Sequence, residues 1–240
     1  MSEFLASLRE LNFYSLVLRL VLAMLLGGMI GMERGRKRRA AGFRTYLLVS
    51  MGAALTMLLG QYLFSMQSGS WAELSNSLSI RTDVSRLGAQ VINGIGFLGA
   101  GTIIVTGRQE VKGLTTAAGL WASACMGLAV GAGFYECVLL AFVFILLSIR
   151  VLPHIENYVI ENSRNINIYV EFESMDDIGS VINRIKNLNA NILDVEIDRG
   201  GGEKAHPSAC FILRLQKKTR HIDFLACLAE NGRICAIEEL

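Results

Sequence analysis

Several polar side chains lie within or beside stretches that are otherwise apolar enough to cross a membrane. Asp83, Arg86, Gln90 and Asn93 follow a 3-4-3 spacing, which places all four on one face of a helix. Arg19 lies about six residues inside an earlier apolar stretch. Because an ionisable group inside a bilayer is costly, such residues are functional candidates.

Arg19 and Asp83 are expected at similar depths near the outer membrane surface, so the first hypothesis is a buried ion pair between them. In one alternative, both residues are packing ties, which hold helices together and have no chemical role. In a second alternative, the Arg19 side chain extends outward to the headgroup region. The spacing alone does not separate these three arrangements.

The elements that position these residues are apolar stretches long enough to be membrane helices. A helix needs about 20 apolar residues to cross a ~30 Å hydrocarbon core. Suitable stretches cover residues 13–32, 45–64, 86–105, 114–131 and 135–150. The composition agrees, with 52% apolar residues, 18% charged residues and a mean hydropathy of +0.43. We therefore expect an α-helical membrane bundle of about five helices within residues 1–152.

Basic residues indicate how this bundle is oriented. Six of the 13 Lys and Arg residues in 1–152 fall within residues 34–44. Short loops rich in Lys and Arg remain cytoplasmic, so the N-terminus is expected outside and everything after Arg150 in the cytoplasm. The same loop is expected to contact anionic lipid headgroups. Nucleic-acid binding is not expected, because no aromatic residues are interleaved with these charges.

Small residues recur at four-residue spacing in the predicted helices, which is typical of close helix packing in lipid. They are Gly27, Gly31 and Gly35 in the first helix, Gly52, Thr56 and Gly60 in the second, and Thr115, Gly119, Ser123, Gly127 and Gly131 in the fourth. Residues 94–101 of the third helix carry four glycines, a high load for a regular helix. The alternative for this segment is a broken or re-entrant helix that exposes backbone to a cavity.

A second, polar region follows Pro153. Residues 153–240 carry 10 Lys and Arg against 14 Asp and Glu, whereas residues 1–152 carry 13 against 7. Alternating stretches at 165–173, 191–199, 208–216 and 233–239 predict strands, with helices at 175–189 and 220–231 between them. The order βαββαβ predicts a ferredoxin-like α+β domain over residues 165–240, after a linker at 153–164.

Acidic residues alternate along the second of these strands. Asp194, Glu196 and Asp198 would lie on one face and are weak candidates for Mg²⁺ ligands. The favoured alternative is the solvated side of a sheet whose other side buries Leu193, Val195 and Ile197. The chain has no GxSxG, HExxH or phosphate-loop motif, so neither a catalytic residue nor a cofactor is expected.

Three blocks of sequence resemble the MgtC/SapB family of bacterial inner-membrane proteins. They are GGMIGMERGRKRRAAGFRT, DVSRLGAQVINGIGFLGAGTII and GLTTAAGLWASACMGLAVGAGFY, which occur in the order of the family. The resemblance covers residues 15–150 and also implies that the C-terminal domain is ACT-like. Its characteristic polar positions fall on Glu33, Arg34, Arg44, Thr45, Asp83, Arg86, Gln90, Thr115, Thr116 and Trp121. Two positions depart from the family pattern, with Phe43 in place of leucine and Val84 in place of proline.

The resemblance implies a non-enzymatic regulator linked to magnesium limitation, to ion and ATP homeostasis and to virulence. Such a protein would act on another membrane protein, with an ATPase as one candidate. ACT-like domains bind a small ligand or pair with their own copy, so a homodimer is also compatible. The alternative function is a small ion or solute permease, including one for Mg²⁺, with Asp83, Arg86, Gln90 and Asn93 along its pathway.

Overall fold

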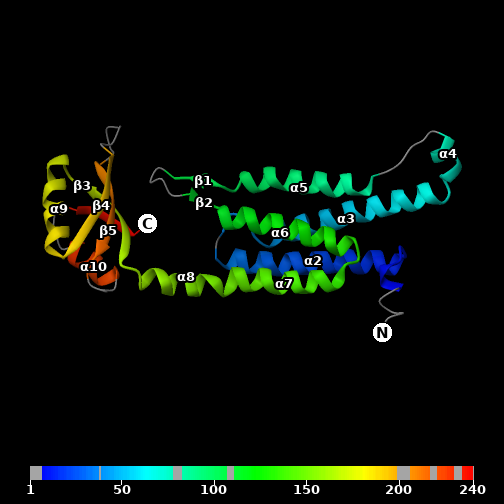
Figure 1. Cartoon of the computed structure of the whole chain (residues 1–240), viewed down its shortest axis with the longest axis horizontal. Coiled ribbons are helices and arrows are strands. Elements are labelled where there is room, and N and C mark those ends of the chain that lie inside the picture. The colour runs from blue at the N-terminus through cyan, green and yellow to red at the C-terminus, as the bar shows by residue number, and fades with distance from the viewer. Residues whose placement is uncertain are drawn as a thin grey trace. The chain divides into compact units, whose positions relative to one another are not determined.

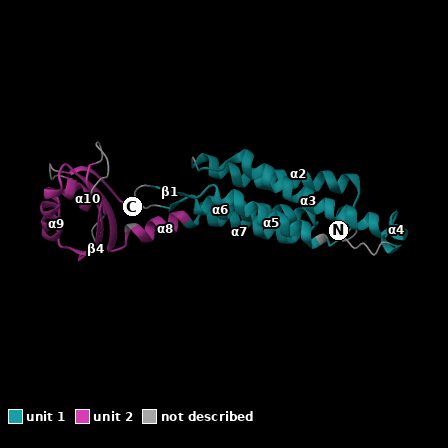
Figure 2. Cartoon of the chain, turned by 90° about the horizontal axis from the view of Figure 1, so that it is seen from above, with its two compact units in different colours: residues 1–152 teal, residues 153–240 magenta. Residues whose placement is uncertain are grey.

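The protein was analysed as a computed structural model that describes residues 7–37, 39–77, 83–106, 111–198, 206–216, 221–229 and 234–239. The chain divides into two compact units, Met1–Leu152 and Pro153–Leu240 (Figure 2). Each unit has its own hydrophobic core, and the two are described separately.

The first unit consists of helices that lie alongside one another (Figure 1). They are α2 (Phe13–Arg36), α3 (Phe43–Ser68), α4 (Ala72–Ser77), α5 (Val84–Ala100), α6 (Leu114–Gly131) and α7 (Tyr135–Arg150). Four helical stretches are long and apolar enough to cross a membrane, namely α2, α3, α6 and the helical stretch Tyr135–Ile160. Helix α5 has 17 residues and spans about 26 Å, at the lower end of the length required.

Helix α3 lies between α2 and α6, and glycines allow close approach on both sides. A Cβ added to Gly27 would lie 2.7 Å from the Tyr46 carbonyl oxygen, and one added to Gly31 would lie 2.8 Å from Phe43 Cα. On α6, an added Cβ would lie 2.2 Å from the Ser50 carbonyl oxygen at Gly127 and 2.5 Å from the Ala54 carbonyl oxygen at Gly131. These glycines therefore make the close contacts that their spacing predicts.

The small-residue prediction is wrong at two positions. A Cβ added to Gly35 or Gly52 would meet nothing within 4 Å, so neither glycine lies at a close contact between the described helices. Gly35 is the penultimate residue of α2, beyond the region where α3 packs closely. The four-residue spacing identifies one face of a helix but does not say how far the neighbouring helix extends along that face.

The broken-helix alternative for the third span is also wrong. Helix α5 is regular from Val84 to Ala100 and packs against α3 and α6. It ends five residues before the predicted end, and residues 104–105 instead form β1 (Ile104–Val105) of a hairpin with β2 (Val111–Lys112). Gly99 packs against Ala117 of α6, whereas Gly94 and Gly96 have nothing within 4 Å of an added Cβ.

Helix α8 (Leu152–Glu161) begins at the last residue of the first unit and continues into the second, so most of the predicted linker is a helix. The elements β3 (Asn165–Phe172), η1 (Met175–Asp177), α9 (Ile178–Asn187), β4 (Ala190–Asp198), β5 (Ser208–Leu215), α10 (His221–Ala229) and β6 (Ile234–Glu239) follow. Strand order β4-β5-β3-β6 with antiparallel pairing is the ferredoxin-like arrangement, in agreement with the sequence. Apolar side chains from the strands and both helices fill one core.

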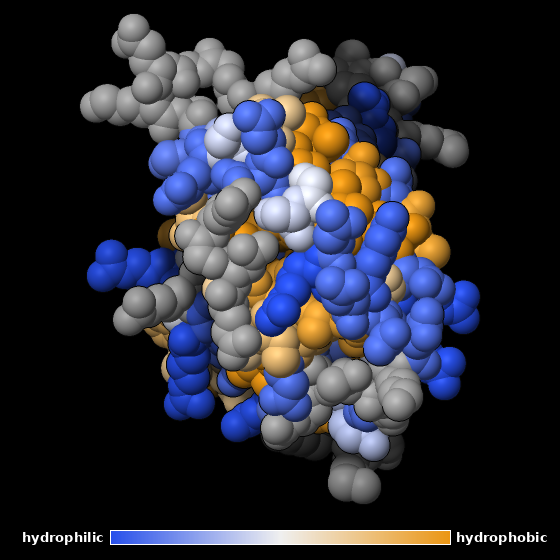
Figure 3. Space-filling model, turned by 90° about the vertical axis from the view of Figure 1, so that its left-hand side faces the viewer, coloured by the Kyte–Doolittle hydropathy of each residue, from blue (hydrophilic) through white to orange (hydrophobic). Residues whose placement is uncertain are grey.

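One prediction about strand β4 is wrong. The pairing of β4 with β5 shifts between Ile192 and Asp194, so the regular alternation of the strand is interrupted there. Leu193 is 57% exposed and Ile197 is 47% exposed, while Ile192 and Val195 pack against the core. Figure 3 views the molecule from the left-hand side of Figure 1, and hydrophobic side chains are visible there between hydrophilic ones.

Candidate functional sites in the membrane unit

Arg19 is fully buried at one end of the helix bundle, and all five of its N–H groups donate hydrogen bonds. The acceptors are Tyr135 Oη (3.3 Å from Nε), Gln61 Oε1 and Gly131 O (both 2.9 Å from Nη1), Leu8 O (3.1 Å from Nη2) and Arg9 O (2.8 Å from Nη2). The Tyr135 hydroxyl in turn donates to Leu8 O at 2.9 Å. Arg19 therefore joins α2 to α3, α6, α7 and the segment before α2.

The acceptors around Arg19 are neutral oxygens, so the predicted Arg19–Asp83 ion pair is wrong. Gly131 is the last residue of α6, and the carbonyl end of a helix carries a partial negative charge that favours a cation. Gly133, with φ of +79°, lets the chain turn beside the guanidinium, because an added Cβ would lie 3.1 Å from Arg19 Nη2. The packing-tie alternative is the one that the structure supports, and the outward extension of the side chain is not observed.

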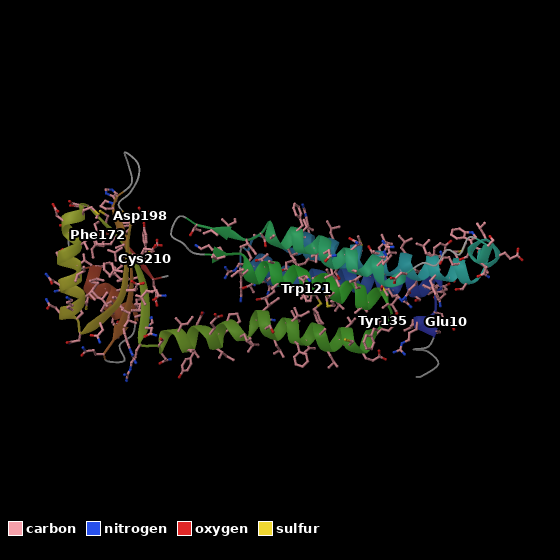
Figure 4. All side chains as sticks on the ribbon, turned by 45° about the horizontal axis from the view of Figure 1, so that its top comes forward. Glu10, Trp121, Tyr135, Phe172, Asp198 and Cys210 are labelled. Atoms are coloured by element: carbon pink, nitrogen blue, oxygen red, sulfur yellow. The ribbon has the colours of Figure 1, made fainter. Side chains whose placement is uncertain are left out.

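The residues that complete this cluster were not predicted from the sequence. Tyr135 begins α7, and Figure 4 places it at the same end of the bundle as Glu10. Next to it, Glu136 forms an exposed ion pair with Arg9. Gln61 lies in α3 near its C-terminal end and, like Arg19, is a polar residue inside an apolar stretch. Gln61 could have been found as a partner of Arg19 by comparing the depths of all polar residues in the apolar stretches, and not only those of opposite charge.

A second buried polar cluster lies where α2 ends and α6 begins. Arg34 is 5% exposed, and its Nη2 donates to Thr116 Oγ1 at 3.1 Å. The Tyr46 hydroxyl donates to the Thr116 carbonyl oxygen at 3.3 Å, and Gly119 leaves room for that hydroxyl. Two of the polar positions implied by the family resemblance, Arg34 and Thr116, are therefore in direct contact. In the described part of the chain, Arg34 Nε has no hydrogen-bonding partner.

The remaining positions implied by the resemblance do not join these clusters. Glu33 is half-buried, while Arg44, Thr45 and Thr115 are exposed at the same helix ends as Arg34. Trp121 is exposed on α6 (Figure 4). The polar residues that sequence analysis grouped as one set therefore occupy several separate places on the membrane unit.

Six exposed residues form what we call the α5 outer face. They are Asp83, Arg86, Gln90, Asn93, Gly96 and Phe97. The helix packs on α3 and α6 through its opposite side, where Ile95 and Gly99 are buried. The predicted shared face of the four polar residues is therefore present, and it points out of the bundle.

Asp83 is the N-cap of α5. Its side chain accepts a hydrogen bond from the Ser85 backbone nitrogen at 2.9 Å, and the Ser85 hydroxyl donates to the same oxygen. These hydrogen bonds, together with the positive charge of Arg86, lower the pKa of Asp83 below its ordinary value. The ionised carboxylate therefore stabilises the start of the helix.

The lowered pKa predicts a pH-dependent contribution of Asp83 to stability. A group whose folded pKa is depressed contributes stability above its unfolded pKa, near 4, and loses that contribution as the pH falls through its folded pKa. Thermal unfolding of the detergent-solubilised protein should show that Asp83→Asn is less stable than the wild type at about pH 7, and that this difference shrinks as the pH falls below about 4. Asparagine keeps the capping geometry, so a difference that persisted unchanged at low pH would contradict a role for the charge.

Between α3 and α5 lies an open groove with a volume of about 350 Å³. Its lining is apolar and consists of Leu48, Val49, Gly52, Ala53, Val91, Ile95, Leu98 and Ala124. In the second unit, no three His, Cys, Asp or Glu side chains among the described residues come close enough to hold a metal ion. Asp194, Glu196 and Asp198 therefore do not form a three-ligand site on β4.

Residues 20–158 match the MgtC family, and this stretch contains Arg34 and the α5 outer face and begins directly after Arg19. The chain belongs to the MgtC family. The match covers more than half of the chain and ends within α8. The MgtC-family assignment and the apolar helices together show that this is a bacterial membrane protein.

Several curated proteins are similar to this MgtC-family chain. An uncharacterised protein of Haemophilus influenzae is 37% identical over 224 residues, which cover 92% of this chain and 90% of its own length. Protein SapB of Bacillus subtilis is 30% identical over 84% of this chain and 85% of its own. YhiD of Escherichia coli K12, whose name describes it as a candidate magnesium transporter, is 41% identical over 56% of this chain and 59% of its own. No solved structure is significantly similar to the chain.

Proposed function

We propose that this protein is a non-enzymatic regulator in the bacterial inner membrane, which acts by contact on another membrane protein, an ATPase being the expected class. The name of the YhiD relative connects the family with magnesium, which supports a role under magnesium limitation and in ion balance. The virulence role implied by the resemblance is part of the same proposal.

The observation that carries this proposal is the direction of the polar side chains. Arg86, Gln90 and Asn93 face out of the bundle, where another membrane component is able to reach them. Inside the bundle, Arg19 and Arg34 are held by hydrogen bonds between helices. Such an arrangement suits a rigid scaffold that presents a polar surface within the bilayer better than a protein with a polar path through its own interior.

The orientation belongs to the same proposal. If α5 also crosses the bilayer, the basic residues near the end of α2 lie on the cytoplasmic side, together with the second unit. Lys37 and Arg44 are exposed there and would contact anionic headgroups. The N-terminus would then lie outside, and the cluster around Arg19 would sit near the outer surface.

The alternative is a permease for Mg²⁺ or another small solute. It is favoured by the exposed polar groups on α5 and by the name of the YhiD relative. Because these groups face outward, a polar path would have to run between α5 and a neighbouring molecule rather than through one bundle.

Two measurements on the full-length protein separate these functions. We expect purified protein in liposomes to give no Mg²⁺ flux above that of empty liposomes. We also expect crosslinking in native membranes, followed by affinity purification, to recover a membrane ATPase in addition to the chain itself. Flux that is abolished by Asn93→Leu would overturn the regulator in favour of the permease. Recovery of no membrane protein other than the chain itself would also count against the regulator.

A further inference from the structure

The α5 outer face exposes hydrogen-bonding groups at membrane depth. Asn93 is the tenth of the 17 residues of α5 and therefore lies near the middle of the span. In the described part of the chain, the side-chain amides of Gln90 and Asn93 have no hydrogen-bonding partner. An amide exposed to hydrocarbon loses its hydrogen bonds to water without replacement, at a cost of several kcal/mol. A stable protein in a bilayer therefore needs something to cover this face.

The charges at the start of the face match a second copy of itself. Asp83 and Arg86 are both exposed and lie three residues apart, so this end carries one negative and one positive group. Two copies related by an axis perpendicular to the membrane would bring each Arg86 towards Asp83 of the other. A lipid headgroup could satisfy Arg86 alone, but it cannot reach the amides deeper in the bilayer.

The deeper part of the face is also self-complementary. The amides of Gln90 and Asn93 each donate and accept, so identical residues from two copies are able to form reciprocal hydrogen bonds. Phe97 is 83% exposed, while Gly94 and Gly96 beside it have nothing within 4 Å of an added Cβ. The phenyl ring of one copy is able to fill the space at these glycines on the other, because small residues permit close helix approach in lipid.

We propose that the α5 outer face is the contact surface of a homodimer, in which α5 of one copy packs against α5 of a second copy. The inference is independent of whether the protein regulates or transports. In a dimer of this kind, the unpaired amides at mid-membrane depth bond across the interface. Because Arg86 of each copy pairs with Asp83 of the other, the two copies have the same orientation in the membrane.

Disulfide crosslinking in intact membranes tests this contact. The five native cysteines at positions 125, 137, 210, 227 and 235 are free and would first be replaced by serine or alanine in the full-length chain. In this background, Gln90→Cys and Asn93→Cys should give an oxidised band at twice the chain mass of 26.3 kDa. Val143→Cys is the matched control, because Val143 is 52% exposed near the middle of α7.

Substitutions on the face itself provide a second measurement. Asn93→Leu should weaken dimer formation by about threefold to tenfold, the effect of losing one interhelical amide hydrogen bond. With the Gln90→Cys reporter, Arg86→Glu should lower the crosslinked fraction because it places four acidic groups together, whereas Arg86→Lys should leave it unchanged. Since Arg86, Gln90 and Asn93 are exposed, these changes leave the packing of the single chain intact.

Several results would overturn the homodimer. One is the absence of the doubled band from Gln90→Cys and Asn93→Cys when both thiols react with a membrane-permeant label. A second is an equally strong doubled band from Val143→Cys. A third is a crosslinked product of another mass. A product of another mass would identify a different membrane protein as the one that covers the α5 outer face. An unchanged crosslinked fraction in both Arg86→Glu and Asn93→Leu would also contradict the proposed contacts.

Discussion

Replacing Arg19 by methionine is expected to destabilise the membrane unit by at least about 3 kcal/mol, because several buried oxygens lose a charged donor at once. Methionine keeps much of the side-chain volume but donates no hydrogen bond. The carbonyls of Arg9 and Gly131 would each lose their hydrogen bond to the guanidinium, and the Leu8 carbonyl would keep only those from Ser15 and Tyr135. Thermal unfolding in detergent, followed by size-exclusion chromatography, measures the loss.

The control for this experiment is Arg9→Met. The Arg9 side chain belongs to the same end of the bundle, but it forms an exposed ion pair with Glu136, and exposed pairs contribute about 0–1 kcal/mol. Arg19→Lys should lie between the two, because lysine retains the charge at the end of α6 but has three donors instead of five. Equal stabilities of Arg19→Met and Arg9→Met would show that the buried hydrogen bonds are not what holds this end together.

Introducing a single methyl group at Gly127 should have the second large effect. In Gly127→Ala, the new Cβ would lie 2.2 Å from the Ser50 carbonyl oxygen and 2.9 Å from its carbonyl carbon. Both are backbone atoms in the middle of α3, so rotation of a side chain cannot relieve the overlap. Helices α3 and α6 would have to separate, which we expect to cost about 3 kcal/mol in the free energy of unfolding. The yield of monodisperse protein and its midpoint of thermal unfolding are the measurements.

Gly52→Ala serves as the matched control for Gly127→Ala. Both glycines lie in membrane helices, but an added Cβ at Gly52 meets nothing within 4 Å. Alanine has a higher helix propensity than glycine by up to about 1 kcal/mol, so Gly52→Ala should be neutral or slightly stabilising. If both substitutions destabilised the protein equally, the effect would come from glycine itself rather than from close packing.

Helix positions could be predicted well because length and hydropathy determine them. The predicted spans 114–131 and 135–150 coincide with α6 and α7, and the βαββαβ order gave the correct sheet. Glycine spacing also found the contacts of Gly27 and Gly127 with α3. These features depend on residues close together in sequence, where periodicity is informative.

The partners of Arg19 could not be predicted from charge. Asp83 was the nearest candidate by sign and depth, but the guanidinium instead bonds to backbone carbonyls, an amide and a hydroxyl. Backbone acceptors exist at the end of every helix and leave no signal in the residue types. In the second unit, Leu193 was misplaced for a related reason, since one shift in strand pairing changes which residues face the core.

The cluster around Arg19 has a consequence for the order in which the protein is made. Its acceptors Gly131 and Tyr135 follow Arg19 by 112 and 116 residues, and Gln61 follows by 42. During synthesis, α2 is therefore complete long before α6 and α7 leave the ribosome. The Arg19 guanidinium therefore stays at the membrane surface or in the insertion machinery until α7 has been synthesised. Arrival of α7 then completes the cluster, so this end of the bundle closes only after the whole membrane unit has been synthesised.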